Sequence, residues 1–385
     1  MAHPATILHN PLRSADACQQ RPGAGREVLA FHRKLAGYEP TPLVPAPDLA
    51  ASLGLRALLV KDESSRLGLP AFKMLGASWA TYRALVERLG HEPAAWTDAA
   101  ELSERFAPLG RLRLVAATDG NHGRAVARMA ALLGYDASIL VPAGTVTARI
   151  DAITGEGADV TVIAGTYDDA VAASAALASD SAVVISDTSW PGYADVPRRV
   201  IEGYATILSE VDEQVASSRL DAWPEVVVVQ MGVGALTAAV VDHADTLIPR
   251  PVVVAVEPQG AACGLRSAEA RRLVALPGPH ESIMAGLNCG TPSEVAWPSV
   301  SAGVDVFVAV DDAAAERAMR DLDALGMEPG ETGAAGLAGL RALVDAGDAD
   351  TSLVAGRSVL VICTEGPTDP LAFERIVGHP PSFST

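Results

Sequence analysis

"QMGVGALTAAV", residues 230–240, decides the fold class of this chain. It follows the apolar run "EVVVV" at 225–229 and opens a run of small residues, so we expect a buried strand, a glycine turn and a helix in succession. The glycines let the backbone approach an anion, which the free N–H groups at the start of a helix attract. The alternative is a tight strand-to-helix turn without a ligand. The pattern is neither GxGxxG nor the lysine-bearing phosphate loop, so a phosphate held here would belong to a resident cofactor that undergoes no phosphoryl transfer.

The same alternation of strands and helices runs along almost the whole chain. It is typical of parallel sheets with crossover helices, the doubly wound α/β class, whose sites lie at the carboxyl ends of the strands. The expected strands are 57–60, 112–117, 137–141, 160–163, 182–186, 226–230, 252–256, 304–310 and 359–363. Clear helical patterns cover 121–133, 147–156, 168–178, 197–215 and 311–325.

Length and composition indicate a globular protein of two domains, because 385 residues exceed the size of one usual core. The net charge of −18 disfavours binding to nucleic acid and to an anionic membrane surface. The sequence shows neither a membrane span nor a secretory signal. Its four cysteines (Cys18, Cys263, Cys289 and Cys363) lack the paired spacing of a disulfide framework or a zinc site. We therefore expect a reduced, cytoplasmic enzyme with no bound metal.

A single lysine interrupts the apolar and small residues of "GLPAFKMLGASWA", 68–80. The apolar residues of 71–89 recur at helical spacing, and Lys73 lies off their stripe. Gly76, Ala77 and Ala80 stand on the side of Lys73 and leave room for something planar. The alternative is a lysine whose stem packs while its ammonium group reaches water.

A second polar cluster lies in "ATDGNHGRAVARMA", 117–130, at the end of an expected strand. Asp119, Asn121 and His122 stand with two glycines in one strand-to-helix turn, which is more than a helix cap requires. The alternative is an ordinary cap and turn.

Lys73, the "DGNHG" turn and the "GVGAL" loop resemble, in this order, the pyridoxal-phosphate enzymes of the tryptophan-synthase-β fold type, or fold type II. The strings "KDESSRLGLPAFKMLGAS", "ATDGNHGRAVA", "DTSWPGY", "ESIMAGLNCGTP", "GETGAAGLAGL" and "CTEGPTDP" resemble the diaminopropionate ammonia-lyase family in particular. The similarity runs from about residue 36 to 375. It implies two doubly wound domains, with 1–75 and 190–385 forming the large domain that binds the cofactor and 76–189 an interleaved smaller one. It also implies a homodimer.

The resemblance implies that Lys73 forms a Schiff base with pyridoxal 5'-phosphate (PLP), which would also account for its small neighbours. The loop of Gly232, Val233, Gly234, Ala235 and Leu236 would hold the phosphate through backbone N–H groups. Asn121 would bond the phenolate oxygen of PLP. Cys363, with Thr364 beside it, would face the pyridine nitrogen, and a neutral partner there suits elimination better than transamination. Glu331 is a further candidate residue of this site; the alternative is that it caps the N-terminus of a helix.

Asp119 and Asp187 decide the reaction within the fold type. Relatives that remove water from serine or threonine usually carry a small uncharged residue at the position of Asp119. The resemblance implies that Lys73 removes the α-proton of the L-substrate and Asp119 that of the D-substrate. Asp187 would approach the same pocket, where a carboxylate can recognise a second amine, although a plain turn is its alternative. Loss of the 3-amino group of 2,3-diaminopropionate would then yield pyruvate and ammonia.

Four other functions stay open at this point. A PLP-dependent hydroxy-amino-acid dehydratase is disfavoured by Asp119, whereas a synthase that replaces a β-substituent needs a second pocket that sequence cannot show. A non-enzymatic protein that keeps the fold as a cofactor carrier or partner-binding module is disfavoured by the intact Lys73, Asn121 and Asp119. The lack of GxGxxG with an acidic ribose partner disfavours a dinucleotide oxidoreductase. Pro70 and Cys363 depart from the family pattern at positions that bear on the substrate range.

Overall fold

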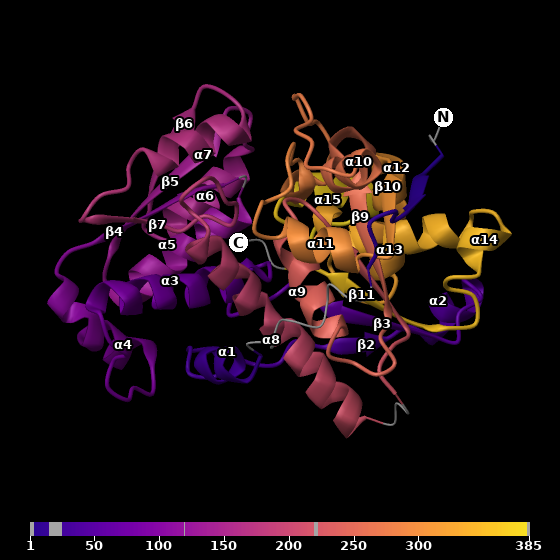
Figure 1. Ribbon diagram of the computed structural model, residues 1–385, viewed down its shortest axis with the longest axis horizontal. Helices are drawn as coiled ribbons and strands as arrows, with labels where there is room; N and C mark the ends of the chain where they lie inside the picture. Colours follow the sequence, from indigo (N-terminus) through magenta and orange to yellow (C-terminus); the bar gives the residue numbers. More distant parts are fainter. Residues whose placement is uncertain (1–3, 15–24, 119, 219–221, 383–385) are drawn as a thin grey trace.

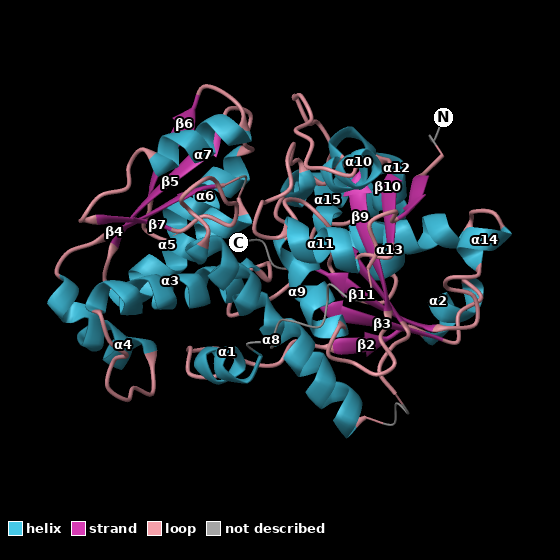
Figure 2. Cartoon of the chain, viewed as in Figure 1, coloured by secondary structure: helices cyan, strands magenta, loops and turns pink. Residues whose placement is uncertain are grey.

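Two β-sheets organise the computed structural model, which describes residues 4–14, 25–118, 120–218 and 222–382 (Figure 2). The larger sheet has the strand order β1-β10-β9-β8-β11-β3-β2, and the smaller one the order β6-β5-β4-β7. The strands are β1 (Thr6–His9), β2 (Leu43–Pro45), β3 (Ala57–Asp62), β4 (Arg113–Ala117), β5 (Asp136–Pro142), β6 (Asp159–Ile163), β7 (Ala182–Val184), β8 (Val226–Gln230), β9 (Val252–Pro258), β10 (Val306–Val310) and β11 (Ser358–Cys363).

Helices cover both sheets (Figure 1). They are α1 (Gly25–His32), α2 (Pro47–Ser52), α3 (Lys73–Leu89), α4 (Ala99–Phe106), α5 (Asn121–Leu133), α6 (Thr147–Gly155), α7 (Tyr167–Ala175), α8 (Asp195–Ser217), α9 (Ala235–Ala244), α10 (Cys263–Ala270), α11 (Trp297–Gly303), α12 (Asp312–Asp323), α13 (Glu331–Val344), α14 (Asp348–Thr351) and α15 (Pro370–Val377). Three short 3-10 turns are η1 (Ala107–Leu109), η2 (Gln259–Ala261) and η3 (Ala285–Leu287). Among the described residues, none of these helices has the length and apolar character needed to cross a bilayer.

The doubly wound α/β class is confirmed, and each expected strand has a counterpart. The smaller sheet is parallel throughout. The larger sheet departs from the prediction at its two edges, where β1 and β2 pair antiparallel to their neighbours. These strands contain only four and three residues, too few for alternating hydrophobicity to reveal them in the sequence.

The smaller sheet and its helices lie within the segment 76–189 that the sequence assigns to a second domain, and they stand to one side of the larger sheet in Figure 1. We propose that 76–189 forms the smaller domain and that 1–75 with 190–385 forms the larger one. Strand β8 is buried along its whole length in the centre of the larger sheet, as its unbroken run of valines predicts. Its carboxyl end therefore lies at the same edge of the sheet as those of its parallel neighbours β9 and β11.

Helices α3 and α8 cross closely, and this crossing corrects the reason given above for the small neighbours of Lys73. A Cβ atom on Gly76 would lie 2.6 Å from Cε1 of Tyr204 and 2.8 Å from Cγ1 of Val200. A Cβ on Gly203 would lie 2.5 Å from the carbonyl oxygen of Leu75. The space beside Gly76 therefore belongs to the aromatic ring of Tyr204, and helix packing accounts for this glycine without a cofactor.

Gly203→Ala should lower the free energy of unfolding by about 2 kcal/mol, because the added methyl group would collide with the backbone of α3. Gly155→Ala is the matched control, since a Cβ on this helical glycine would meet no atom within 4 Å. It should be neutral or stabilising by up to about 1 kcal/mol. Chemical denaturation of both variants measures the difference, and equal stabilities would contradict the close crossing.

Candidate active site

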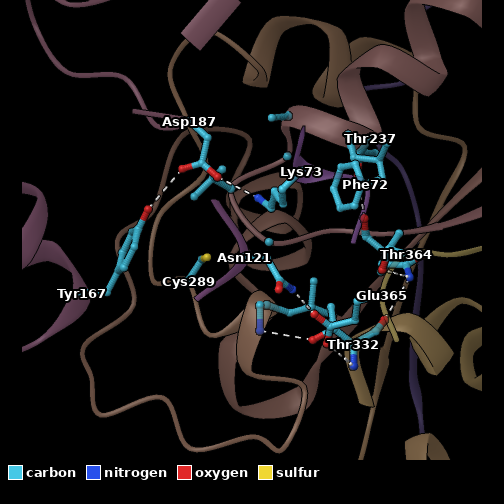
Figure 3. Close-up of a pocket in the computed structure, with 18 residues that line it drawn as sticks. Phe72, Lys73, Asn121, Tyr167, Asp187, Thr237, Cys289, Thr332, Thr364 and Glu365 are labelled. Atoms are coloured by element: carbon cyan, nitrogen blue, oxygen red, sulfur yellow. Dashed lines mark hydrogen bonds and ion pairs between the residues drawn. The ribbon is translucent and has the colours of Figure 1, made fainter. Parts of the chain in front are cut away.

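A cavity opens at the carboxyl ends of β8 and β11 (Figure 3). Its wall also includes the first residues of α3, α5, α7 and α9, the loop after β7, and the segment around η3. This is the edge at which a doubly wound sheet is expected to bind its ligand. Of the residues predicted from the sequence, those that line the cavity are Lys73, Asn121, Asp187, Gly232, Val233, Gly234, Ala235, Leu236 and Thr364.

Two of the predicted residues need separate mention. Asp119 lies outside the described residues, so its place relative to Lys73 stays a prediction. Cys363 is fully buried and does not line the cavity; it packs in the core on the side of α13, where its Sγ lies 3.6 Å from the carbonyl oxygen of Glu365. Neighbouring residues at the end of a strand point to opposite faces, and here the Thr364 side chain faces the cavity.

Lys73 forms an ion pair with Asp187 inside the cavity. Nζ donates a hydrogen bond to Oδ2 at 2.7 Å, and the Tyr167 hydroxyl donates to Oδ1 at 3.2 Å (Figure 3). Burial alone would raise the pKa of the Asp187 carboxyl. The charges of Lys73 and His122 and the hydrogen bonds from Lys73 and Tyr167 outweigh burial, so that this pKa lies well below its usual range. Asp187 is therefore a carboxylate throughout the neutral pH range.

Three side chains hold the loop that carries Asp187. The Tyr193 hydroxyl donates to the carbonyl oxygen of Val184 at 2.7 Å and accepts from the backbone N–H of Ser186 at 3.0 Å. Its ring stacks on Trp190 with 4.0 Å between the ring centroids. His122 Nε2 donates to the carbonyl oxygen of Ile185 at 2.8 Å. The string "DTSWPGY" thus contains both Asp187 and the aromatic pair that positions it.

The glycine loop leaves the cavity open beside the start of α9. Gly234 has a φ of 96°, in the left-handed region, and immediately precedes the first residue of this helix. A Cβ atom on Gly232 would lie 2.9 Å from the carbonyl oxygen of Gly286, so only glycine fits there without a shift. The N–H groups in the first turn of α9 have no partner within the helix and are available to an anion. Thr237 lines the cavity as well, and its hydroxyl donates to the carbonyl oxygen of Gln230 at 3.3 Å.

Sequence reasoning missed Glu365 and Tyr167, whose side chains make hydrogen bonds in this site. Asn121 Nδ2 donates to Oε2 of Glu365, whose Oε1 accepts from the backbone N–H of Thr332 at 3.2 Å (Figure 3). Glu365 is buried and follows strand β11 directly after Thr364. An acidic residue next to an apolar strand end was the available signal. The sequence contains no signal for Tyr167, because this residue belongs to helix α7 and reaches Asp187 only in the folded chain.

Glu331 is buried but does not line the cavity. It is the first residue of α13, and Gly330 occupies the capping position, so the helix-cap alternative is wrong. Its Oε2 has no hydrogen-bond partner among the described residues. Burial raises the pKa of the Glu331 carboxyl to about 7, with Glu365 adding to this effect. The side chain is therefore a source of pH-dependent stability rather than a ligand of the cavity.

Stability should fall as the pH rises from about 5 to 8, because the folded protein keeps a proton on Glu331 that the unfolded chain has already lost at its ordinary pKa of 4.5. Glu331→Gln removes this carboxyl and should stabilise the protein at pH 8 by up to about 3 kcal/mol, with little effect at pH 5. The exposed Glu281→Gln is the control. Unfolding free energies at both pH values provide the measurement; a Glu331→Gln gain that is the same at pH 5 and pH 8 would contradict the raised pKa.

Comparison with known proteins adds family evidence to this geometry. Residues 34–365 match the family model described as "Pyridoxal-phosphate dependent enzyme". The chain is 37% identical over 361 residues to diaminopropionate ammonia-lyase of Escherichia coli strain K12, covering 90% of this chain and 89% of that protein. The chain belongs to the diaminopropionate ammonia-lyase family. A crystal structure of the Escherichia coli enzyme in complex with D-serine superposes with a TM-score of 0.88 at 33% identity, covering 98% of both chains.

A second crystal structure of the Escherichia coli lyase, in complex with an aminoacrylate-PLP azomethine reaction intermediate, has a TM-score of 0.85 at 33% identity and covers 98% of this chain and 97% of that one. PLP is thus the cofactor of this lyase, and the cavity fits it. It combines a lysine amine, a glycine loop that a Cβ would obstruct, and the hydroxyl of Thr364.

Gly232→Val and Gly234→Val should each weaken PLP binding by about tenfold to 100-fold, because a side chain would occupy the space where backbone N–H groups meet the phosphate. Gly347→Val is the control, since a Cβ there would have no atom within 4 Å. Fluorescence titration of the apoenzymes with PLP gives the dissociation constants. Wild-type affinity in both loop variants would exclude this loop as the phosphate site.

Proposed function

We propose that this lyase catalyses α,β-elimination of ammonia from both D- and L-2,3-diaminopropionate, which yields pyruvate and ammonia. The observation that carries the proposal is the buried Asp187 carboxylate, kept charged in the wall of the cavity next to Lys73. A substrate with a second, cationic amine gives this anion a partner. The hydroxyl group of serine or threonine does not require one.

The cofactor site follows from the same residues. We propose that Lys73 carries PLP, that the loop 232–236 holds its phosphate, that Asn121 meets the phenolate oxygen, and that Thr364, in place of Cys363, meets the pyridine nitrogen. When bound, PLP withdraws electrons from the amino acid joined to it, which acidifies the α-proton and allows a β-substituent to leave. Asn121 would then exchange its hydrogen bond with Glu365 for one with the cofactor.

Each side chain then has a defined task. Asp187 binds the 3-amino group as an ammonium ion, so that it departs as neutral ammonia and takes the electron pair of the broken carbon–nitrogen bond. Lys73 removes the α-proton of the L-substrate, and Asp119 that of the D-substrate from the opposite face. The Tyr167 hydroxyl orients the Asp187 carboxylate by its hydrogen bond to Oδ1.

The proposal also covers the oligomeric state and the cellular location. We propose a homodimer, which light scattering during gel filtration would test. A cytoplasmic location agrees with the cysteines, since Cys263, Cys289 and Cys363 all carry free thiols among the described residues. The ligands proposed for this protein are a small amino acid and its cofactor; neither a nucleic acid nor a membrane is included.

A substrate panel of both enantiomers of diaminopropionate and serine, together with L-threonine, tests the function through release of 2-oxo acid. Diaminopropionate should be the best substrate by kcat/KM. Asp119→Asn should lower turnover of the D-enantiomer by about 100-fold or more, the scale expected for removal of a general base, and that of the L-enantiomer far less. Asp187→Asn should raise KM for diaminopropionate of either hand.

The exposed Asp180→Asn serves as the control and should behave as wild type. Equal losses for both enantiomers in Asp119→Asn would refute the two-base scheme and leave Asp119 as a binding residue. A wild-type preference for serine or threonine would instead identify a hydroxy-amino-acid dehydratase. If diaminopropionate and serine release no 2-oxo acid, a β-replacement synthase becomes the better interpretation.

A further inference from the structure

Gln230, the last residue of β8, is buried in the wall of the cavity beside Thr364. Its Nε2 lies 2.9 Å from the carbonyl oxygen of Thr332, 3.3 Å from that of Gly333 and 2.7 Å from Oγ1 of Thr364. Only 3% of Gln230 is exposed, so water does not compete for these contacts. The residue connects the end of β8, the start of α13 and the end of β11 through one amide group.

The surroundings of this amide fix its orientation. Carbonyl oxygens only accept hydrogen bonds, so the end of the amide that contacts two of them must be the NH₂ group. The other end, Oε1, has no hydrogen-bond partner among the described residues. Turning the amide over would place its oxygen against both carbonyl oxygens. Gln230 is therefore held by its donor end.

This orientation determines what the Thr364 hydroxyl can do. An amide nitrogen does not accept hydrogen bonds, so Oγ1 of Thr364 must accept the bond from Gln230. The hydroxyl keeps its own proton for another acceptor, and Thr364 makes no second side-chain hydrogen bond to a described residue. Because Thr364 lines the cavity, this proton is available to a ligand there (Figure 3).

We propose that Gln230 is a positioning residue that makes the Thr364 hydroxyl a hydrogen-bond donor, so that PLP binds with its pyridine nitrogen unprotonated. The inference rests on the proposed placement of the ring against Thr364. An unprotonated ring withdraws electrons less strongly than a protonated one, so it stabilises negative charge at the α-carbon less well. This favours loss of the β-substituent over return of a proton to the α-carbon. The choice between these two outcomes would thus depend on the hydrogen bond from Gln230 to Thr364.

Gln230→Glu tests the inference with a side chain of the same shape. A carboxylate has no hydrogen to donate, so it accepts the proton of the Thr364 hydroxyl. The Thr364 hydroxyl would then present a lone pair to the ring, which must be protonated to make a hydrogen bond. Gln259→Glu is the matched control, because Gln259 donates only to the carbonyl oxygen of Pro4.

The measurement is nuclear magnetic resonance of PLP labelled with ¹⁵N at the ring nitrogen and bound to each holoenzyme. The wild type and Gln259→Glu should show an unprotonated nitrogen from pH 6 to 9. Gln230→Glu should show a protonated nitrogen at pH 7, with PLP bound about threefold to tenfold more weakly. A protonated nitrogen in the wild type, or an unprotonated one in Gln230→Glu, would overturn the inference.

A second pair of variants covers the case in which Gln230→Glu does not fold. Thr364→Val should weaken PLP binding by about threefold to tenfold, and Thr364→Ser, which keeps the hydroxyl, should restore it. Wild-type affinity in Thr364→Val would show that the ring does not meet Thr364 and would overturn the inference. The proposed function would survive that result if borohydride still fixed PLP to Lys73 and diaminopropionate still released pyruvate.

Discussion

The site depends on one ion pair between distant parts of the chain, Lys73 with Asp187. Lys73 is the first residue of α3, where the partial positive charge of the helix N-terminus disfavours a cation. Its side chain is 20% exposed and that of Asp187 only 7%, so neither charge is well hydrated. The pair compensates both charges and draws the loop after β7 onto the start of α3. The cavity takes its shape from this contact.

A second group of buried charges fixes the segment that leads to Lys73. Arg66 contacts carboxylate oxygens of Glu63 and Glu210 at 2.6 Å, and Lys61 contacts Glu210 at 2.7 Å, all with fully buried side chains. Removal of one partner would leave a buried charge uncompensated, which is costly. This network joins β3 and its following loop to α8, the helix that also packs against α3. The position of the Lys73 amine thus depends both on its own ion pair with Asp187 and on this buried network.

The chemistry of the site reflects this rigidity. We propose that, once Lys73 carries the cofactor, the Asp187 carboxylate can bind another cation, such as the ammonium group of a diamino substrate. Asn121 and Glu365, which also line the cavity, are joined by a hydrogen bond. We therefore propose that Asp187 and Asn121 exchange hydrogen-bond partners when the substrate and the cofactor bind.

The sequence by itself determined the alternation of strands and helices, since that pattern is set by local hydrophobic periodicity; helix α5 has the predicted bounds of 121–133. It also identified Lys73, Asn121 and the glycine loop, whose residue types are unusual for their places. Only the tertiary structure decided that Thr364 rather than Cys363 faces the cavity, because that depends on which side of β11 the site lies. The same holds for Glu365, Tyr167 and Gln230, whose roles arise from contacts between segments 20 to 244 residues apart. Side-chain periodicity is local, whereas the meeting of strand ends is a property of the folded chain.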